Sequence, residues 1–461
     1  MRFDALDRAA WLSAAALALA TGIVVLRGDQ VGLRLVRAQP GSDAQSVSTR
    51  APIVLTLSEP VDGATLEGRI QVEPFISGTL RWSGATVIWT PAQPLQLDQQ
   101  YTVTLQAGVR SQRGRALQAD VRWSFRTGSL RALWLSPSEG ATNLYRLDLS
   151  RPDAAPEVLT QEPFGVYDYA VSPDGRYVIY GVNREANNPE RDLWLLDLNT
   201  GERRLAVRCD GEVCQAPSWS ADSARVAFER RALILGTVGR SPGPGRIWIL
   251  DVERGEATPL FTDPQRIGSL PRFAPRGGKL AFYDPRQSAV TVIDTESGDQ
   301  QQLPSVLGDS GAWSPDGARL IYPELLPFEA GQYSQLLLAD FRAAIVAPLL
   351  PISASNDSGA AWSPLGDWIA FGRQPGAGSG SALGVHVWRA RSDGSAPAEP
   401  IAEEVGQSYG AVSWSPDGKW LLAQRFDLTA INAKPEIWLI KADGSERRLL
   451  ARDALLPSWM P

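Results

Sequence analysis

The sequence predicts an all-β protein with three successive parts: an N-terminal membrane helix, a β-sandwich, and a seven-bladed β-propeller closed by the C-terminal strand. Three observations support this prediction. A five-residue phrase recurs along the last two thirds of the 461-residue chain. Short segments rich in β-branched and aromatic residues precede the first copy, and a charge-free apolar run lies near the N-terminus.

The recurring phrase reads Trp-Ser-Pro-Asp-Gly in its complete form. Its copies begin at Val171, Trp219, Phe273, Trp313, Trp362 and Trp414, and a truncated copy begins at Trp459. Successive copies are 40 to 54 residues apart. A period of this length, with several strands in each unit, is typical of a propeller of small sheets.

Each repeat contains the elements of a four-stranded sheet. After Trp414, the Ser-Pro-Asp-Gly segment predicts a tight turn, because proline presets φ and glycine accepts a positive φ. Segments 420–424, 436–441 and 446–450 are predicted strands, because they are rich in apolar residues and are separated by turn residues. The residues before each Trp-Ser pair supply the remaining strand.

The first and last repeats are incomplete, and each lacks what the other has. Segments 132–136, 143–148 and 156–160 provide the second, third and fourth strands of a unit without its first strand. Segment 456–460 is a first strand without the rest. Together they complete one sheet, so that six full units and this composite make seven blades. Closure of this kind protects the strand edges of a propeller.

The phrase followed by a strand resembles the TolB-like propeller repeat, a bacterial relative of WD repeats, and the resemblance covers residues 128–461. It implies a β-propeller. Propellers of this group serve as docking platforms, as gates on peptidases and occasionally as lyases. The count of seven blades departs from the six associated with TolB, so the resemblance carries the fold and not the role of TolB.

The N-terminal segment 1–27 is predicted to be a signal-anchor that spans the membrane. Residues 9–26 are apolar or small and carry no charge, and as a helix they are long enough for a bilayer core. A signal peptide cleaved after 18–20 and a buried helix are the alternatives. Segment 28–47 is polar with glycine and proline, and is predicted to be a linker.

Block 48–127 is predicted to be a β-sandwich, because short alternating strands follow one another at close spacing. Its motifs resemble the bacterial Ig-like domain of SbsA-type surface proteins. The matching segments are 57–61, 89–91, 101–105 and 123–127. In that family the domain is a spacer or adhesion module outside the cell, and it has no fixed ligand residues.

Composition limits the function. The net charge of −6 gives no basic surface for nucleic acid, so nucleic-acid binding is not expected. The cysteines, Cys209 and Cys214, flank an Asp-Gly pair and are predicted to form a local disulfide outside the cytoplasm; two free thiols are the alternative. The single histidine, His386, is too little for a metal cluster, and we predict neither metal nor cofactor.

One motif matches the nucleophile elbow of serine hydrolases. Residues 406–410 read Gly-Gln-Ser-Tyr-Gly, but the helix that such an elbow requires is not predicted after them. We therefore expect no catalytic role for Ser408. Gln407, Ser408 and Tyr409 are instead predicted to lie in a polar loop between blades that faces a ligand.

Two further loops are candidate ligand contacts. Asp309 and Ser310 precede one Trp-Ser-Pro phrase, and Asp357 and Ser358 precede the next. Because loops entering the innermost strands ring the channel of a propeller, these four side chains are predicted to line a polar pocket. Capping of a tight turn is the alternative for each aspartate.

The sequence as a whole predicts a non-enzymatic, membrane-tethered extracytoplasmic protein. The expected location is the cell membrane, with a single pass and the bulk of the chain in the periplasm or on the cell surface. The propeller would bind an envelope or secreted protein, a peptide or a glycan. A propeller-type lyase or other carbohydrate-active enzyme is the alternative, and the gate domain of a hydrolase is a further one.

Overall fold

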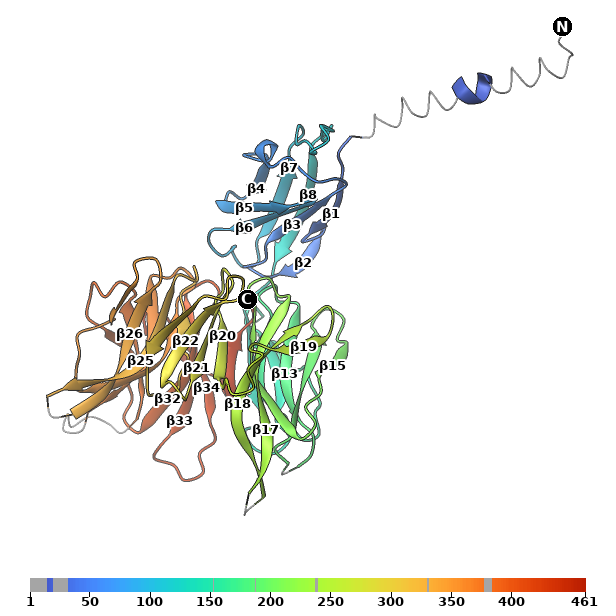
Figure 1. Cartoon of the computed structure of the whole chain (residues 1–461). Coiled ribbons are helices and arrows are strands. Elements are labelled where there is room, and N and C mark those ends of the chain that lie inside the picture. Colours follow the sequence, from blue (N-terminus) through green and yellow to red (C-terminus); the bar gives the residue numbers. More distant parts are fainter. Residues whose placement is uncertain are drawn as a thin grey trace, which may run out of the picture. The chain divides into compact units, whose positions relative to one another are not determined.

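The computed structural model describes residues 15–19, 32–151, 153–186, 188–236, 239–329, 331–376 and 384–461 (Figure 1). Their regular secondary structure is almost entirely β-strand. The chain divides into two compact units, with the main boundary between Thr127 and Gly128. The unit before this boundary has a sandwich topology, and the unit after it is a ring of small sheets.

The prediction of an N-terminal membrane helix is wrong. Within the described part of the chain, no helix is long and apolar enough to cross a membrane. The helical segment near the N-terminus covers residues 15–19. The rest of the predicted segment, 1–14 and 20–27, lies outside the described residues.

The N-terminal unit contains two four-stranded sheets. In the first, the strand order is β1 (Leu35–Gln39), β3 (Ile53–Leu57), β6 (Thr86–Pro91) and β5 (Gly78–Ser83). In the second, the order is β2 (Ala44–Val47), β8 (Val121–Thr127), β7 (Gln100–Leu105) and β4 (Ile70–Glu73). A 3-10 turn, η1 (Gly63–Thr65), precedes β4.

Buried residues alternate with more exposed ones along the strands of this unit, and the buried residues form its core. Ile53, Leu55 and Leu57 of β3 are buried, and Tyr101 of β7 stacks on Phe125 of β8 with ring centroids 5.8 Å apart. This period-two pattern is that of strands with one face in a core. Strands β1 and β2 lie in segment 28–47, which the polar composition predicted to be a linker; their pairing with β3 and β8 overrides that composition.

The described residues of the C-terminal unit form seven groups of four antiparallel strands, called sheets 1 to 7 here in chain order of their first strands. A single parallel pairing, of Arg191 in β14 with Val213 in β16, joins sheets 1 and 2 into one eight-stranded sheet. Sheet 1 has β12 (Val166–Val171), β13 (Tyr177–Asn183), β14 (Arg191–Asp197) and β15 (Arg203–Val207). Sheet 2 has β16 (Glu212–Trp219), β17 (Arg225–Gly236), β18 (Gly239–Asp251) and β19 (Glu256–Pro259). Sheet 3 has β20 (Ser269–Phe273), β21 (Lys279–Asp284), β22 (Ala289–Asp294) and β23 (Gln300–Pro304).

The remaining four sheets follow the same order. Sheet 4 has β24 (Ala312–Trp313), β25 (Arg319–Phe328), β26 (Gly331–Asp340) and β27 (Ile345–Pro348). Sheet 5 has β28 (Ser355–Trp362), β29 (Trp368–Pro375), β30 (His386–Arg391) and β31 (Glu399–Ala402). Sheet 6 has β32 (Gln407–Trp414), β33 (Trp420–Asp427), β34 (Glu436–Lys441) and β35 (Arg447–Arg452). Sheet 7 has β36 (Leu455–Trp459), β9 (Arg131–Ser136), β10 (Asn143–Asp148) and β11 (Glu157–Val158).

The C-terminal strand closes the ring by pairing with the start of the propeller. Strand β36 is antiparallel to β9, with Leu455 opposite Leu135 and Trp459 opposite Ala132. Sheet 7 packs on both neighbours, because Trp134 and Trp459 join a buried cluster with sheet 6 while Leu133 and Leu135 join one with sheet 1. The unit is therefore a β-propeller with no open edge between its first and last sheets.

Neighbouring sheets are joined by hydrogen bonds between their first strands. In five of the seven interfaces the indole N–H of the phrase tryptophan donates to a carbonyl of the preceding sheet, at 2.9–3.1 Å; the pairs are Trp219 with Ala170, Trp313 with Arg272, Trp362 with Ala312, Trp414 with Ala361 and Trp459 with Ser413. Where the phrase has phenylalanine, the Phe273 N–H donates to Ser218 Oγ at 2.9 Å. Where it has valine, the Tyr169 hydroxyl donates to the Leu456 carbonyl at 2.6 Å.

We predict that deleting residues 455–461 destabilises the propeller strongly. The deletion leaves β9 unpaired and removes Trp459, whose loss alone costs about 3–5 kcal/mol for a buried tryptophan. Thermal unfolding followed by near-ultraviolet circular dichroism measures the effect, and a sharply lowered melting temperature or insoluble protein is the expected result.

Two variants make this measurement specific. Deleting Pro461 alone is the control and leaves the melting temperature close to that of the wild type. Trp459→Phe keeps most of the apolar volume and removes the bond to Ser413, so we expect a loss of about 1 kcal/mol. An unchanged melting temperature after deletion of 455–461 would show that the ring is held closed by other contacts.

Candidate functional site

The serine of the recurring phrase has a structural role. Ser415 is fully buried; its hydroxyl accepts a hydrogen bond from Trp420 N at 2.9 Å and donates one to Asp417 Oδ1 at 2.6 Å. The phrase at Ser314 repeats this arrangement with Arg319 and Asp316. The hydroxyl and carboxylate are thus used to fix the turn between the first and second strands of a sheet. The polar residues of the phrase are not available for chemistry.

The first strands carry a repeated β-bulge. In sheets 1, 2, 3, 5, 6 and 7, two residues of the first strand lie opposite one residue of the second. In five of these six bulges, all but that of sheet 1, the first residue has a positive φ of 47–60°; these residues are Ala216, Leu270, Gly359, Ala411 and Leu456. Four of the five are not glycine, so the sheet imposes this backbone conformation against its intrinsic cost.

A cavity of about 420 Å³ lies among the first strands of sheets 3 to 6. We call it the channel pocket. Most of its lining side chains are apolar, but about half of its surface is polar, and its charged lining residues are Arg272 and Asp309. The other lining residues are Phe273, Pro275, Gly311, Ala312, Trp313, Ile321, Pro323, Leu336, Gly359, Ala360, Ala411 and Val412. Two bulge residues, Gly359 and Ala411, are therefore part of the pocket.

The structure separates the two predicted aspartate loops. Asp309 lines the channel pocket and accepts a hydrogen bond from Gly311 N at 2.9 Å, which forms the tight turn that was the alternative interpretation. Ser310 beside it is fully buried. Asp357 is buried and forms a two-pronged ion pair with Arg373, with both oxygen–nitrogen distances at 2.7 Å. Asp357 and Ser358 are not among the lining residues of the channel pocket.

Asp309 and Asp357 have different surroundings because they stand at different distances from the phrase tryptophan. Asp357 lies one residue further from its phrase tryptophan than Asp309 does. Strand β28 already begins at Ser355 and contains Asp357, whereas β24 begins only at Ala312. A residue inside a strand alternates between two faces, so a shift of one position changes its neighbours.

The segment Gln407–Tyr409 is part of a strand and not the loop that the sequence predicted. It begins β32, and Gln407 lies opposite Asp427 of β33. The hydroxyl of Ser408 accepts a hydrogen bond from Val385 N at 3.1 Å, and Tyr409 N donates to Val385 O at 2.7 Å. Ser408 is thus placed on an extended strand, without the strand-to-helix turn that exposes the nucleophile of a serine hydrolase.

Three side chains that the sequence analysis did not single out lie beside the bulge residues and can accept hydrogen bonds. Each meets the N–H of a bulge residue on the following sheet. Asp168 Oδ2 accepts from Ala216 N at 2.5 Å, and Gln424 Oε1 accepts from Leu456 N at 2.8 Å. Glu229 faces Leu270 N, whose N–H favours the charged carboxylate, but the Oε1 atom of Glu229 accepts no hydrogen bond within the described structure. Glu229 and Gln424 both lie ten residues after the phrase tryptophan of their sheet, which is the signal that a repeat alignment could have used.

The two buried carboxylates are costly to ionise. Burial raises the pKa of Asp168, against the opposing effects of the Ala216 N–H and the positive charge of Arg191. Burial also raises the pKa of Glu229, against Arg231, Gln215 and the Leu270 N–H. Transfer of a carboxylate from water to a low-dielectric interior disfavours its charged form, which explains both directions.

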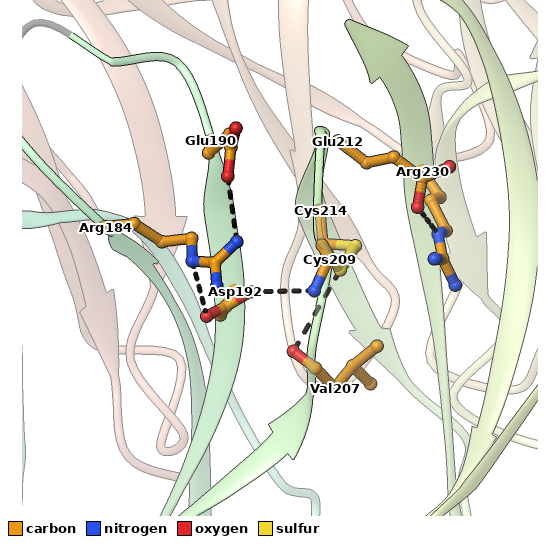
Figure 2. The surroundings of a disulfide bond; sticks show 8 residues. All are labelled: Arg184, Glu190, Asp192, Val207, Cys209, Glu212, Cys214 and Arg230. Carbon is orange, nitrogen blue, oxygen red and sulfur yellow. Dashed lines mark hydrogen bonds and ion pairs between the residues drawn. A yellow bond between two sulfur atoms is a disulfide. The ribbon is translucent and has the colours of Figure 1, made fainter.

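The cysteine pair lies where sheet 1 joins sheet 2. Cys209 and Cys214 form a disulfide with a Cα–Cα distance of 6.3 Å, and both are fully buried. Asp192 Oδ1 accepts a hydrogen bond from Cys209 N at 2.7 Å, and Arg184 contacts both Glu190 and Asp192 (Figure 2). The disulfide thus fixes the crossing from β15 to β16 at the start of a bulged first strand.

The described residues offer no group of three or more His, Cys, Asp or Glu side chains placed to hold a metal ion. The side chain of His386 is buried in β30.

Comparison with known proteins identifies the N-terminal unit. Residues 29–127 match the family model of the bacterial Ig-like domain. This segment is a bacterial Ig-like domain. The match begins within the predicted linker, in agreement with strands β1 and β2. A search of curated proteins finds no match to the chain.

Solved structures similar to the chain include several propeller proteins. TolB from Acinetobacter baumannii is 16% identical, with a TM-score of 0.44 over 85% of this chain and 83% of that one. An oligogalacturonate lyase from Vibrio parahaemolyticus is 15% identical, with a TM-score of 0.51 over 67% and 85%. The acylaminoacyl peptidase of Pyrococcus horikoshii is 13% identical, with a TM-score of 0.51 over 70% of this chain and 50% of that one. At these identities the likeness shows the fold alone.

We predict that the disulfide stabilises the propeller by about 2 kcal/mol, the value for a closed loop of about six residues. The free energy of unfolding, measured by chemical denaturation with and without a reductant, should fall by this amount when the wild-type disulfide is reduced. The control is the double variant Cys209→Ser/Cys214→Ser, whose stability should not respond to the reductant. Equal stability of oxidised and reduced wild type would contradict the prediction.

We also predict that Glu229→Gln stabilises the propeller at neutral and basic pH. A folded-state pKa above the ordinary value means that Glu229 favours folding below the unfolded-state pKa, and that this contribution is lost as pH rises through the folded-state pKa. Glutamine removes the charge and keeps an acceptor for Leu270 N, as Gln424 does for Leu456 N. The variant should therefore melt above the wild type at pH 8.

Measuring the melting temperatures at several pH values tests the direction of this prediction. The difference in melting temperature between Glu229→Gln and wild type should narrow as pH falls toward the ordinary carboxyl range. Glu253→Gln, which changes an exposed carboxylate after β18, is the control and should show no such trend. A variant that melts below the wild type at pH 8 would indicate that the ionised carboxylate is needed for the fold.

Proposed function

We propose that the protein is a non-enzymatic, extracytoplasmic binding protein whose propeller holds a peptide segment of a partner protein in the channel pocket. The observation that carries this proposal is the pocket itself. Its volume of about 420 Å³ is in the range of small-molecule and peptide sites. Apolar side chains beside polar groups that fix orientation are typical of sites that bind a ligand.

The polar groups of the pocket favour recognition of a peptide. Arg272 is exposed and offers a guanidinium group, and Asp309 is half-buried and offers a carboxylate. A peptide backbone carries both donors and acceptors, and its side chains fill apolar walls such as those formed by Trp313 and Val412. The proposed partner is therefore an envelope or secreted protein with an extended segment.

The disulfide supports a location outside the cytoplasm. Disulfides persist in oxidising compartments and are rare where thiols are kept reduced. The bacterial Ig-like domain is consistent with this location, because the resemblance to SbsA-type modules implies a spacer at the cell surface.

The test is a selection of peptides against the full-length protein, followed by calorimetric titration of the selected peptides. We expect Arg272→Glu to weaken binding at least about tenfold, because a charge-assisted hydrogen bond is lost and a repulsive charge is introduced. Arg254→Glu is the control: Arg254 is an exposed arginine at the turn after β18, and its replacement should leave the affinity unchanged.

Thermal unfolding of both variants checks that the fold is kept. Peptides that bind Arg272→Glu as tightly as wild type, in protein of unchanged melting temperature, would place the binding surface elsewhere and contradict the proposal.

A further inference from the structure

The seven-fold repeat allows positions in different sheets to be compared, and the comparison exposes a difference at the bulges. In five of the six bulged first strands the backbone is the same: two residues oppose one, and the first of them has a positive φ of 47–60°. In sheets 2 and 7 the N–H of that residue donates a hydrogen bond to a side chain of the preceding sheet, and in sheet 3 it faces the carboxylate of Glu229. This shared backbone directs the N–H away from its own ladder and toward the neighbour.

The acceptor comes from one position of the repeat. Ten residues after the phrase tryptophan, sheets 2 and 6 have Glu229 and Gln424, which serve the bulges of sheets 3 and 7. Sheet 1 has Gly181 at this position, and Asp168 occupies the space instead: a Cβ on Gly181 would lie 2.5 Å from Asp168 Oδ1. The interior therefore supplies an acceptor even where the repeat position has no side chain.

Sheets 4 and 5 break this rule. Their residues at the same position are Pro323 and Gly372, which carry no acceptor. The bulge residues that follow them are Gly359 and Ala411, and no side chain of the described chain accepts a hydrogen bond from either N–H. Both residues are exposed, and both line the channel pocket together with Pro323. The two N–H groups without a side-chain acceptor are thus the two that reach the pocket.

We propose that the N–H groups of Gly359 and Ala411 bind a carboxylate, and that this carboxylate is the free C-terminus of a peptide. The inference deepens the proposed function, on which it rests. The hydrogen bond from Ala216 N to Asp168 shows that a carboxylate fits the corresponding N–H group elsewhere in the ring. Arg272 adds a positive charge to the same pocket. Backbone N–H groups in a concave site are a recurrent way of capturing a chain-terminal carboxylate.

The walls of the pocket favour a peptide terminus over an isolated anion. Ile321, Leu336 and Val412 give the pocket an apolar surface that would receive the last side chain of the peptide. Asp309, which already binds Gly311 N, is placed at the same pocket and disfavours a ligand with several negative charges. One carboxylate next to an apolar side chain matches this arrangement.

The test compares N-acetylated tripeptides that end in leucine, phenylalanine or valine, each as the free acid and as the C-terminal amide, by titration calorimetry against the full-length protein. We expect the free acids to bind at least about tenfold more tightly than the amides, since a charged acceptor makes the stronger hydrogen bonds. Equal affinity of acid and amide overturns this inference and leaves the proposed peptide-binding function standing. Binding by neither form overturns it as well, whether or not peptide selection yields other ligands.

A substitution locates the site. Pro323→Gln introduces the acceptor that Gln424 provides in sheet 6, so it should occupy Gly359 N and reduce the affinity for the free acids to that for the amides. Pro323→Leu is the matched control, of similar size and without an acceptor, and should keep the preference for the acid. If folded Pro323→Gln still binds the free acids more tightly than the amides, the assignment to Gly359 is overturned. If that variant fails to fold, the comparison of acid and amide in the wild type still tests whether the pocket binds a carboxylate.

An acidic sugar is the competing source of a carboxylate. Glucuronic acid and its short oligomers are titrated alongside the peptides. Binding of these sugars in preference to the tripeptides, lost in Pro323→Gln, would assign the site to a glycan and overturn the peptide assignment.

Discussion

Every sheet of the propeller is held to the next by a hydrogen bond at its first strand, and the rest of the structure depends on this ring of seven bonds. Five of them use the indole N–H of the recurring phrase. At the two positions without tryptophan, Ser218 and Tyr169 provide a substitute. Each bond is worth only about 1 kcal/mol. Their importance lies in geometry, because they fix the first strands relative to one another and so determine the shape of the channel.

The ring also explains why strained backbone persists along the channel. Ala216, Leu270, Ala411 and Leu456 adopt a positive φ that glycine would accept more readily. Such residues keep this conformation only when the surrounding structure determines it, and here each lies between two sheets joined by an indole or its substitute. The side chains of Asp168 and Gln424 then accept hydrogen bonds from N–H groups that have left the ladder, and Glu229 faces a third.

The sequence predicted the features that local chemistry repeats. The Trp-Ser-Pro-Asp-Gly phrase marked each first strand and the turn after it, because its serine and aspartate form the turn within a few residues. The two incomplete end segments predicted the pairing of β36 with β9. The spacing of Cys209 and Cys214 predicted a local disulfide, and the structure has one.

The features that the sequence missed depend on contacts between distant segments. The ion pair of Asp357 with Arg373 joins two strands, and its formation depends on a one-residue shift of register. No residue type marks the bulges, since four of the five positive-φ positions carry alanine or leucine. Strands β1 and β2 have polar sequences and are ordered by their partners. The N-terminal apolar run predicted a membrane helix from composition alone, and no helix among the described residues is long and apolar enough to cross a membrane.

The central claim is that the channel presents two amide groups without a side-chain acceptor among the five bulges that share a positive φ. Amide hydrogen exchange of the ligand-free protein, resolved by residue, tests it most directly. The account predicts slow exchange at Ala216 and Leu456, whose N–H groups donate to Asp168 and Gln424, and fast exchange at Gly359 and Ala411. Exchange at Gly359 and Ala411 as slow as at the first two would reveal an internal acceptor and contradict the account.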